Sequence, residues 1–297
     1  MNKNCFIDKD IELTAAEIDL LTSLGLNVTV FNEATVNYHQ ITYLLLHSKL
    51  SDEQLLQMKN CKYIGIRAHN TDYVNKKITD AQDIVVKGLT HQHGINAVAE
   101  HTFSLIFSLA KNLINTHQNT LQNKWRDNLP LNYELSDKKL GIIGHGQIGQ
   151  KVAELGNAFG MEVLIAGKKT GKKADQVDFE TVMEEADVIS LHLSSKPENN
   201  KYIDHAALKL MKQDAILINT ARGSILDYSA LESELQKGKF RGIGLDVFDE
   251  EPLKRSPLSQ YKNVILTPHI AYMTGETLNN MNQELIINLQ SFMNELN

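Results

Sequence analysis

The sequence L-G-I-I-G-H-G-Q-I-G runs from Leu140 to Gly149 and joins a short apolar segment to the start of a helical pattern. Gly144 permits the tight turn that follows the strand, and Gly146 removes a side chain where a pyrophosphate must approach the backbone. Gly149 lets the helix pack closely on the sheet, and the first NH groups of the helix then face the phosphates. A glycine-rich turn of another α/β sheet is the alternative, but the strand before the glycines and the helix after them favour a dinucleotide-binding unit.

Length and composition limit the classes of protein that fit. The 297 residues suit two domains better than one, and the net charge of −6 with a pI near 6.0 argues against a nucleic-acid partner. The two cysteines, Cys5 and Cys61, are too few for a disulfide framework and lack metal-ligand spacing, so we expect a reducing compartment and no metal site. The first residues lack the apolar core of a signal peptide, and no segment is apolar enough to span a bilayer. We therefore predict a cytoplasmic protein without a membrane or nucleic-acid partner.

Short apolar runs alternate with longer helical patterns along the chain, which is typical of βα units around a largely parallel sheet. Before the glycine motif, strands are predicted at residues 5–7, 28–31, 43–46 and 63–66. After it, strands are predicted at residues 163–166, 188–192, 215–219, 242–247 and 264–267. One long helical pattern at residues 96–122 leads from the first group of strands to the second. The chain is thus predicted to be an α/β protein with two doubly wound parallel sheets.

Three later segments each place a polar, chemically active residue just beyond an apolar strand. They are I-N-T-A-R-G around Arg222, G-L-D-V-F-D-E-E-P around Glu251 and L-T-P-H-I-A around His269. Each residue alone has an ordinary interpretation, as a surface arginine, a solvated acid or a hydrogen-bonded histidine. Ligands of open α/β sheets bind at the carboxyl ends of the strands, where the three can converge beside the predicted coenzyme site. Their combination therefore favours an enzyme.

Through these motifs, their order and their spacing, the chain resembles the D-isomer-specific 2-hydroxyacid dehydrogenase family over nearly its whole length. The resemblance implies a Rossmann coenzyme domain inserted into a smaller, flavodoxin-like substrate domain. On this basis the coenzyme domain comprises residues 98–273, and the substrate domain comprises residues 1–97 and 274–297. The implied activity is hydride transfer between NAD(P)H and a small 2-keto acid, which yields a D-2-hydroxy acid.

The resemblance assigns catalytic roles that the chemistry of the side chains supports. Arg222 offers a planar fork of donors for the substrate carboxylate and the carbonyl oxygen. His269 is the expected proton donor in reduction and the acceptor in oxidation, because imidazole can act in both directions near neutral pH. Glu251 is expected to pair with His269, because a carboxylate beside the ring stabilises imidazolium and fixes its orientation. Asp246 is expected to bind the coenzyme near the nicotinamide amide, with a structural hydrogen bond as the alternative.

Further coenzyme contacts follow from the resemblance. They lie at the start of the helix after the glycine motif and in two later loops, at Gln147, Ile148, Leu193, Ser194, Thr220 and Ala221. Ser194 replaces a proline that is common in the family. Gly167 stands where NAD enzymes usually carry an acid for the ribose hydroxyls, and Lys168 and Lys169 follow it. Without a carboxylate to repel a 2′-phosphate, NADPH is expected to be accepted and slightly favoured over NADH, unless the lysines belong to an ordinary solvated loop.

The residues that select the substrate are less clearly marked. The expected carboxylate-binding loop, I-R-A-H-N-T-D-Y-V-N from Ile66, carries His69 and Asn70 where the family commonly has a glycine-containing turn. The segment H-G-I-N-A-V-A-E-H, together with Tyr272 after His269, is most similar to D-lactate and related dehydrogenases. A D-lactate-like product is therefore favoured, and reduction of hydroxypyruvate or glyoxylate is the alternative within the family.

Two further expectations concern partners and functional class. The family implies a homodimer, which we expect to form through a helix at residues 103–113 whose apolar faces exceed what one domain needs to bury. A binding protein that senses the dinucleotide without turnover is a rival interpretation, because relatives within a superfamily can keep a fold and differ in function. The intact arginine, glutamate and histidine favour the enzyme.

Overall fold

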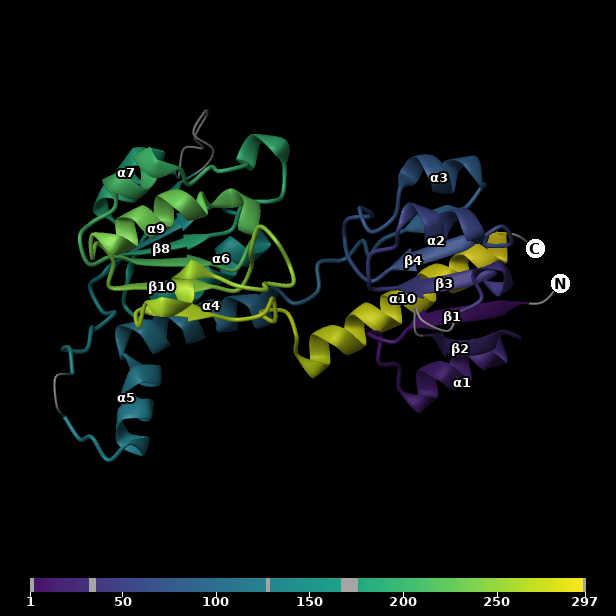
Figure 1. Ribbon diagram of the computed structural model, residues 1–297, viewed down its shortest axis with the longest axis horizontal. Helices are drawn as coiled ribbons and strands as arrows, with labels where there is room; N and C mark the ends of the chain where they lie inside the picture. Colours follow the sequence, from purple (N-terminus) through teal and green to yellow (C-terminus); the bar gives the residue numbers. More distant parts are fainter. Residues whose placement is uncertain (1–2, 32–35, 127–128, 167–175, 296–297) are drawn as a thin grey trace. The chain divides into compact units, whose positions relative to one another are not determined.

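The computed structural model describes residues 3–31, 36–126, 129–166 and 176–295, and the chain divides into two compact units. The first unit comprises Met1–His93 and Thr274–Asn297, and the second comprises Gly94–Met273. In Figure 1 the purple to blue strands and the yellow C-terminal helix therefore belong to one unit, although they come from opposite ends of the sequence. The first crossover lies just before helix α4 (Ile95–Ala110), a few residues earlier than the boundary at residue 97 that we expected.

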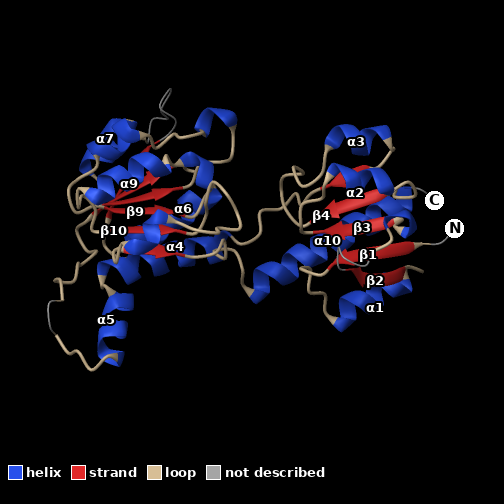
Figure 2. Ribbon diagram, viewed as in Figure 1, coloured by secondary structure: helices blue, strands red, loops and turns tan. Residues whose placement is uncertain are grey.

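The first unit is built around a parallel sheet with the strand order β2-β1-β3-β4-β5, which is the flavodoxin-like order. Its strands are β1 (Asn4–Asp8), β2 (Asn27–Phe31), β3 (Tyr43–Leu46), β4 (Tyr63–Ile66) and β5 (Val85–Lys87). β3 and β4 are buried along their whole length, because they are central strands of a sheet covered by helices (Figure 2). β5 was not predicted, since three partly exposed residues are too few for a recognisable apolar pattern.

The C-terminal helix completes the first unit. The helices of this unit are α1 (Ala15–Ser23), α2 (Asp52–Gln57), α3 (Lys76–Ala81) and α10 (Gly275–Glu295), with the 3-10 helix η1 (Tyr38–Gln40). α10 packs on β4, where the ring of Phe292 stacks on Tyr63 with 4.9 Å between centroids. Leu285 and Leu289 of the same helix are fully buried. Burial of these side chains ties the end of the chain to the unit formed by its beginning.

The second unit contains a parallel sheet with the strand order β11-β10-β9-β8-β6-β7. Its strands are β6 (Lys139–Ile143), β7 (Glu162–Ala166), β8 (Val188–Leu191), β9 (Ile216–Asn219), β10 (Gly242–Leu245) and β11 (Val264–Leu266). Val177 adds an isolated parallel bridge to Ala166 beyond β7. The strand order reverses at β6, between β7 and β8, and open α/β sheets bind ligands at such a switch point.

Helices cover both faces of this second sheet (Figure 2). They are α4, α5 (Leu113–Leu121), α6 (Gln147–Ala158), α7 (Phe179–Glu185), α8 (His205–Leu210) and α9 (Tyr228–Gln236), with the 3-10 helices η2 (Pro197–Asn199), η3 (Gly223–Ile225) and η4 (Pro257–Gln260). Successive strand residues point to opposite faces, so Ile142 packs in the core with α4 and α6 while Ile143 packs in the core with α7, α8 and α9. Within the described residues, no helix combines the length and the apolar character needed to cross a bilayer.

The single helix predicted at residues 96–122 is two helices. α4 ends before Asn112 and α5 begins after it, and Asn112 has a φ of +49° in the left-handed region. Asparagine is one of the few residues other than glycine that adopt this conformation readily, so the chain turns here without a glycine. The apolar pattern continues across the break, which is why the sequence reads as one helix.

The apolar face of α4 is used inside the second unit. Phe103, Ile106 and Leu109 are buried in the core that α4 forms with α6 and the sheet. The surplus of apolar surface expected at residues 103–113 is therefore mostly buried within the unit. Exposed large apolar side chains lie instead on α5 and on the segment that follows it, at Leu113, Ile114, Leu121, Trp125 and Leu131.

Candidate active site

The glycine motif forms the turn between β6 and α6, at the switch point of the second sheet. Gly144 has a φ of +100°, and a Cβ there would lie 2.6 Å from the carbonyl oxygen of His192. A Cβ at Gly149 would collide with the carbonyl oxygen of Gly144, because the helix packs closely on the turn. At Gly146, apart from the adjacent residues, no described atom lies within 4 Å of the Cβ position. The turn is thus tight at two glycines and open to a ligand at the third.

The helix that follows the turn begins without a side-chain cap. Its N-cap is Gly146, and Gln147 and Ile148 form the start of α6. Gln147 is exposed, whereas Ile148 is half-buried against the core shared by α4 and α6. The first NH groups of a helix without a side-chain cap can bind phosphate oxygens, and the helix dipole favours negative charge there.

The other predicted coenzyme residues lie in the loops at the same ends of the strands. Leu193 is half-buried and Ser194 is exposed after β8, and the Ser194 carbonyl oxygen accepts a hydrogen bond of 2.8 Å from the Asn199 amide. Thr220 follows β9 and is buried, with its hydroxyl 3.0 Å from that of Thr102. Ala221 is half-buried beside it. The prediction for Gly167, Lys168 and Lys169 falls outside the described residues.

Glu251 and His269 are in direct hydrogen-bond contact. Glu251 Oε2 lies 2.7 Å from His269 Nδ1, and Glu251 Oε1 accepts a hydrogen bond of 2.9 Å from the Phe248 amide. Partial burial acts to raise the pKa of Glu251, but the hydrogen bonds from His269 and Phe248 and the positive charge of Arg222 outweigh it and leave the pKa below its usual value. Nδ1 of His269 is engaged by the carboxylate, so Nε2 is the ring nitrogen left to face a substrate.

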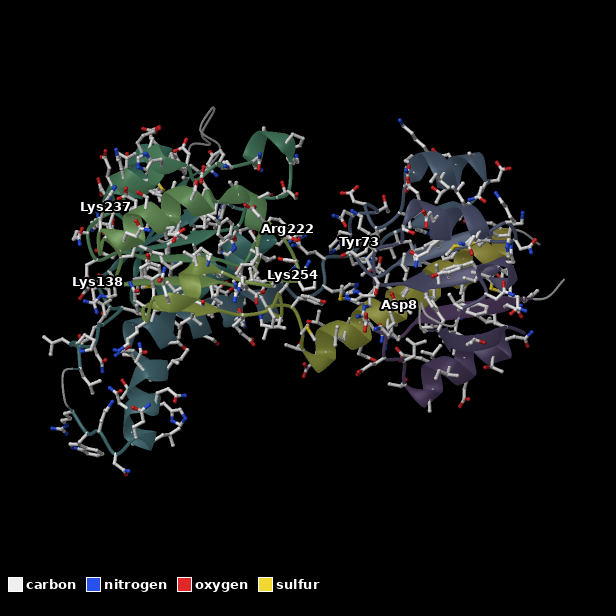
Figure 3. The ribbon with its side chains drawn as sticks, viewed as in Figure 1. Asp8, Tyr73, Lys138, Arg222, Lys237 and Lys254 are labelled. Atoms are coloured by element: carbon white, nitrogen blue, oxygen red, sulfur yellow. The ribbon has the colours of Figure 1, made fainter. Side chains whose placement is uncertain are left out.

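Arg222 stands in the loop that follows β9, and its side chain is exposed (Figure 3). The amide of Asn219 closes this loop, since its oxygen accepts from the Ala221 NH at 3.0 Å and its nitrogen donates to the Arg222 carbonyl at 2.9 Å. Arg222 Nη1 donates to the Ala221 carbonyl at 2.6 Å, which leaves the remaining guanidinium donors for other partners. An anion is the natural partner for a fork of this kind.

Two loops meet at Gly223. One is the loop after β9 that carries Arg222, the arginine loop, and the other is the loop after β10 that carries Glu251, the glutamate loop. A Cβ at this buried glycine would overlap the carbonyl group of Phe248, so the two backbones are in direct contact. Phe248 in turn donates to Glu251, and the charge of Arg222 acts on Glu251. The second unit therefore brings together Arg222, Glu251 and His269, three residues that the sequence places far apart.

Asp246 has surroundings different from those expected of a coenzyme ligand. Its side chain is fully buried, and its carboxylate accepts from the Thr267 hydroxyl at 2.6 Å and from the NH groups of Ile270 at 3.0 Å and Ala271 at 2.9 Å. The Asp246 carbonyl accepts from the His269 NH at 2.8 Å, and His269 has a φ of +55°. Asp246 thus holds the backbone of the histidine segment, which favours the structural alternative over a direct coenzyme contact.

The predicted substrate residues fall in both units. In the second unit, the ring of Tyr272 meets the His269 ring edge-on with 6.0 Å between centroids. In the first unit, His69 Nδ1 lies 3.1 Å from the carbonyl oxygen of Leu89, and Asn70 is exposed. Their loop touches Gly88, where a Cβ would lie 2.7 Å from the Ala68 carbonyl oxygen.

Several residues that shape the site were not predicted. Asn219 closes the arginine loop, Gly223 permits the contact between loops, and His101 lies 3.1 Å from the Thr267 hydroxyl. Asn219 carried a usable signal, since it is a polar residue at the end of the buried run I-L-I-N. His101 carried only a weak one, as a lone histidine in an otherwise apolar helical pattern.

Comparisons with known proteins agree with this architecture. A family model for the NAD-binding domain of D-isomer-specific 2-hydroxyacid dehydrogenases matches residues 103–271. A glyoxylate reductase of Thermococcus litoralis is 34% identical over 263 residues, which cover 84% of this chain and 78% of that protein. An acyclic imino acid reductase, Bsp5, solved with NADPH and D-Arg, is 30% identical with a TM-score of 0.82, over 98% of this chain and 97% of that one. The D-lactate dehydrogenase of Aquifex aeolicus, solved with NAD and lactic acid, is 29% identical with a TM-score of 0.80, over 98% of this chain and 96% of that one.

The chain therefore belongs to the D-isomer-specific 2-hydroxyacid dehydrogenase family, and it is an oxidoreductase with an NAD-binding domain. The predicted family, the α/β fold class with two parallel sheets and the assignment as an enzyme are confirmed. The rival interpretation as a binding protein without turnover loses its support, because these relatives are named as reductases and dehydrogenases.

Proposed function

We propose that this enzyme reduces a small 2-keto acid to the D-2-hydroxy acid with NAD(P)H and catalyses the reverse oxidation. The observation that carries the proposal is the 2.7 Å contact between Glu251 and His269, with the charge of Arg222 acting on the same carboxylate. These groups belong to the unit that also holds the glycine turn. Reduction of a ketone next to a carboxylate needs a group that binds the carboxylate, a hydride for the carbon and a proton for the oxygen. The three side chains supply the binding group and the proton.

Each side chain has a defined part in the reaction. Arg222 binds the substrate carboxylate and polarises the carbonyl oxygen. A nicotinamide coenzyme, when bound, would supply a hydride for the carbonyl carbon, and the electron pair of the C=O π bond would then reside on the oxygen. That oxygen takes a proton from Nε2 of the His269 imidazolium, and the electrons of the N–H bond remain on the ring. Glu251 orients the ring and balances its positive charge until the proton leaves.

The residues present fit a dinucleotide coenzyme. The open side of Gly146 leaves room for a pyrophosphate at the start of α6. NADPH is expected to be accepted and slightly favoured, because the sequence places Gly167, Lys168 and Lys169 where NAD enzymes usually carry an acid. Solved relatives hold NADPH in one case and NAD in another, so both coenzymes are compatible with this fold.

The proposed substrate is a keto acid with a small side chain. Tyr272 lies edge-on to His269, and a large ring beside the proton donor limits the space for the substrate. The sequence favoured a D-lactate-like product, whereas a relative with 34% identity over most of the chain is a glyoxylate reductase. We therefore rank glyoxylate and hydroxypyruvate above pyruvate, with His69 and Asn70 as candidate contacts of the substrate in the first unit.

A panel of 2-keto acids with NADH and with NADPH tests the proposal. We expect turnover of glyoxylate, hydroxypyruvate or pyruvate that produces the D-isomer where a stereocentre is formed. His269→Ala should lower kcat at least about a hundredfold without loss of coenzyme binding, because a positioned acid contributes 10²- to 10⁴-fold. Tight coenzyme binding without turnover of any of these acids, or full activity of His269→Ala, would overturn the proposal.

The oligomeric state forms part of the same proposal. We infer a homodimer in which α5 and the segment after it contact a second copy. None of the α5 residues is buried, and Trp125 is 71% exposed just beyond the helix. A hollow of about 580 Å³ lies beside α5, lined in part by Leu129, Leu131 and Phe240. Sedimentation of the wild type and of Trp125→Ala tests this, and a wild type that is monomeric at micromolar concentration contradicts it.

A further inference from the structure

Two consecutive residues of α4 contact the segments that carry the proposed anchor and the proposed proton donor. His101 Nε2 lies 3.1 Å from the hydroxyl of Thr267, two residues before His269. The hydroxyl of Thr102 lies 3.0 Å from that of Thr220, two residues before Arg222. α4 begins at Ile95, immediately after the crossover between the two units.

The direction of the hydrogen bond from His101 follows from counting protons. The Thr267 hydroxyl has one proton, and it lies 2.6 Å from Asp246 Oδ1, which can only accept. Thr267 therefore donates to Asp246, and its oxygen accepts from His101 Nε2–H. The same His101 nitrogen lies 3.6 Å from Asp246 Oδ1, and His101 is only 20% exposed. His101 thus supports a carboxylate that is fully buried.

That carboxylate controls the backbone around the proton donor. It accepts from the NH groups of Ile270 and Ala271, while the Asp246 carbonyl accepts from the His269 NH. His269 itself has a φ of +55°, a conformation that residues with a side chain rarely adopt. Such a conformation persists only where the surrounding hydrogen bonds hold it. The chain of contacts runs from His101 through Thr267 and Asp246 to the backbone of His269.

The neighbouring residue of α4 holds the arginine loop in a similar way. Thr102 is fully buried, and its hydroxyl donates to the Val98 carbonyl at 2.8 Å. Since that proton is used, the Thr220 hydroxyl donates to Thr102. Thr220 lies within the short turn that the Asn219 amide closes between Asn219 and Arg222.

We propose that His101 and Thr102 are positioning residues. From one turn of α4 they fix the positions of the proposed proton donor, His269, and of the proposed substrate anchor, Arg222. The inference rests on the proposed function for its kinetic consequences, but the geometry of the segment can be tested without turnover. Small displacements of reacting groups are costly, because reaction rates depend steeply on the distance and orientation of the groups involved.

The kinetic test compares two substitutions of His101. His101→Leu removes the donor, and we expect kcat to fall roughly tenfold to a hundredfold while coenzyme affinity stays unchanged. His101→Gln can place an amide NH near the position of Nε2 and should restore most of kcat. Thr102→Val, which keeps the shape but removes the hydroxyl, should raise KM for the keto acid about tenfold. Ser104→Ala, on the exposed face of the same helix, is the matched control and should behave as the wild type.

Amide hydrogen exchange provides a test that does not depend on activity. In His101→Leu, exchange at Ile270 and Ala271 should accelerate relative to the wild type, whereas exchange in α6 should not change. His101→Gln should return exchange to the wild-type rate. If the wild type turns over no keto acid, the proposed function fails, and the exchange data still decide the role of His101. The inference would be overturned if His101→Leu kept the kcat and the amide exchange rates of the wild type. It would also be overturned if kcat and exchange changed to the same extent in His101→Leu and His101→Gln.

Discussion

The carboxylate of Glu251 lies 2.7 Å from Nδ1 of His269, although the two residues come from different loops of the second unit. This contact engages one ring nitrogen and leaves Nε2 for chemistry. The other carboxylate oxygen, Glu251 Oε1, accepts a hydrogen bond from the Phe248 amide, so both oxygens of the carboxylate are held. The pair therefore has the geometry of an oriented acid and base rather than of a mobile surface ion pair.

Glu251→Gln should change the pH dependence of the reaction. Burial acts to raise the pKa of Glu251, but hydrogen bonds and nearby positive charge bring it below its usual value, so the carboxylate stays ionised at neutral pH. Reduction consumes a proton and oxidation releases one, so the two directions respond to pH in opposite senses. The substitution removes the negative charge beside the ring of His269, so the pH profiles of both directions should differ from those of the wild type. Profiles of kcat/KM in both directions measure this, and profiles identical to those of the wild type would contradict it.

Gly223→Ala should separate the arginine loop from the glutamate loop. The new Cβ would overlap the carbonyl group of Phe248, so one backbone must move. We expect kcat/KM to fall at least roughly tenfold and the protein to lose about 2 kcal/mol of stability. Keto-acid turnover and thermal unfolding report the two effects. Gly275→Ala is the matched control, because no described atom lies within 4 Å of that Cβ position apart from the adjacent residues and the nearby backbone of its own helix.

Glu284→Gln should weaken the first unit in a way that depends on pH. Burial acts to raise the pKa of Glu284, but hydrogen bonds from Thr90, His93 and the His91 amide lower it to about 2, from about 4.5 in the unfolded chain. A carboxyl group with a lowered pKa stabilises the folded state above its unfolded pKa, and the contribution disappears as the pH falls toward its folded pKa. The free energy of unfolding of the wild type should exceed that of the variant by up to about 3 kcal/mol at neutral pH.

The difference in free energy of unfolding between the wild type and Glu284→Gln should decline as the pH falls from 4.5 to about 2. Urea unfolding at a series of pH values measures it. Glu276→Gln, an exposed residue of the same helix, should show no comparable difference. An advantage that is constant across this pH range would mean that the contacts of Glu284 stabilise the fold without a contribution from its charge.

Replacement of Lys168 and Lys169 by alanine should affect the two coenzymes differently. If these cations interact with a 2′-phosphate, KM for NADPH rises about tenfold in the double variant, and KM for NADH stays within about twofold of the wild type. Steady-state kinetics with each coenzyme decide the outcome. Lys77→Ala, an exposed lysine of the first unit, controls for a general loss of positive charge. A strong preference of the wild type for NADH would refute the charge argument.

Local sequence patterns were sufficient to predict most strands of the two sheets and to mark the residues of the proposed site. Buried parallel strands appear as continuous apolar runs, so β3, β4 and β9 were visible within a residue of their ends. The glycine motif was recognisable because each glycine meets a separate steric need within one short turn. The charged residues were visible because polar groups directly after buried strands lie at the edge of a sheet where ligands bind.

Contacts between distant segments were beyond the reach of those patterns. His101 and Thr267 are 166 positions apart, and their meeting depends on how α4 packs across β9 and β10. The burial of Asp246 was equally hidden, because a carboxylate after a strand can face a ligand or the protein itself. Periodicity records which face of an element is apolar, whereas the partner of each polar group is set by the packing of whole elements. The residues of the proposed chemistry are therefore visible in the linear order of the chain, while the contacts that hold His269 in place exist only in the folded chain.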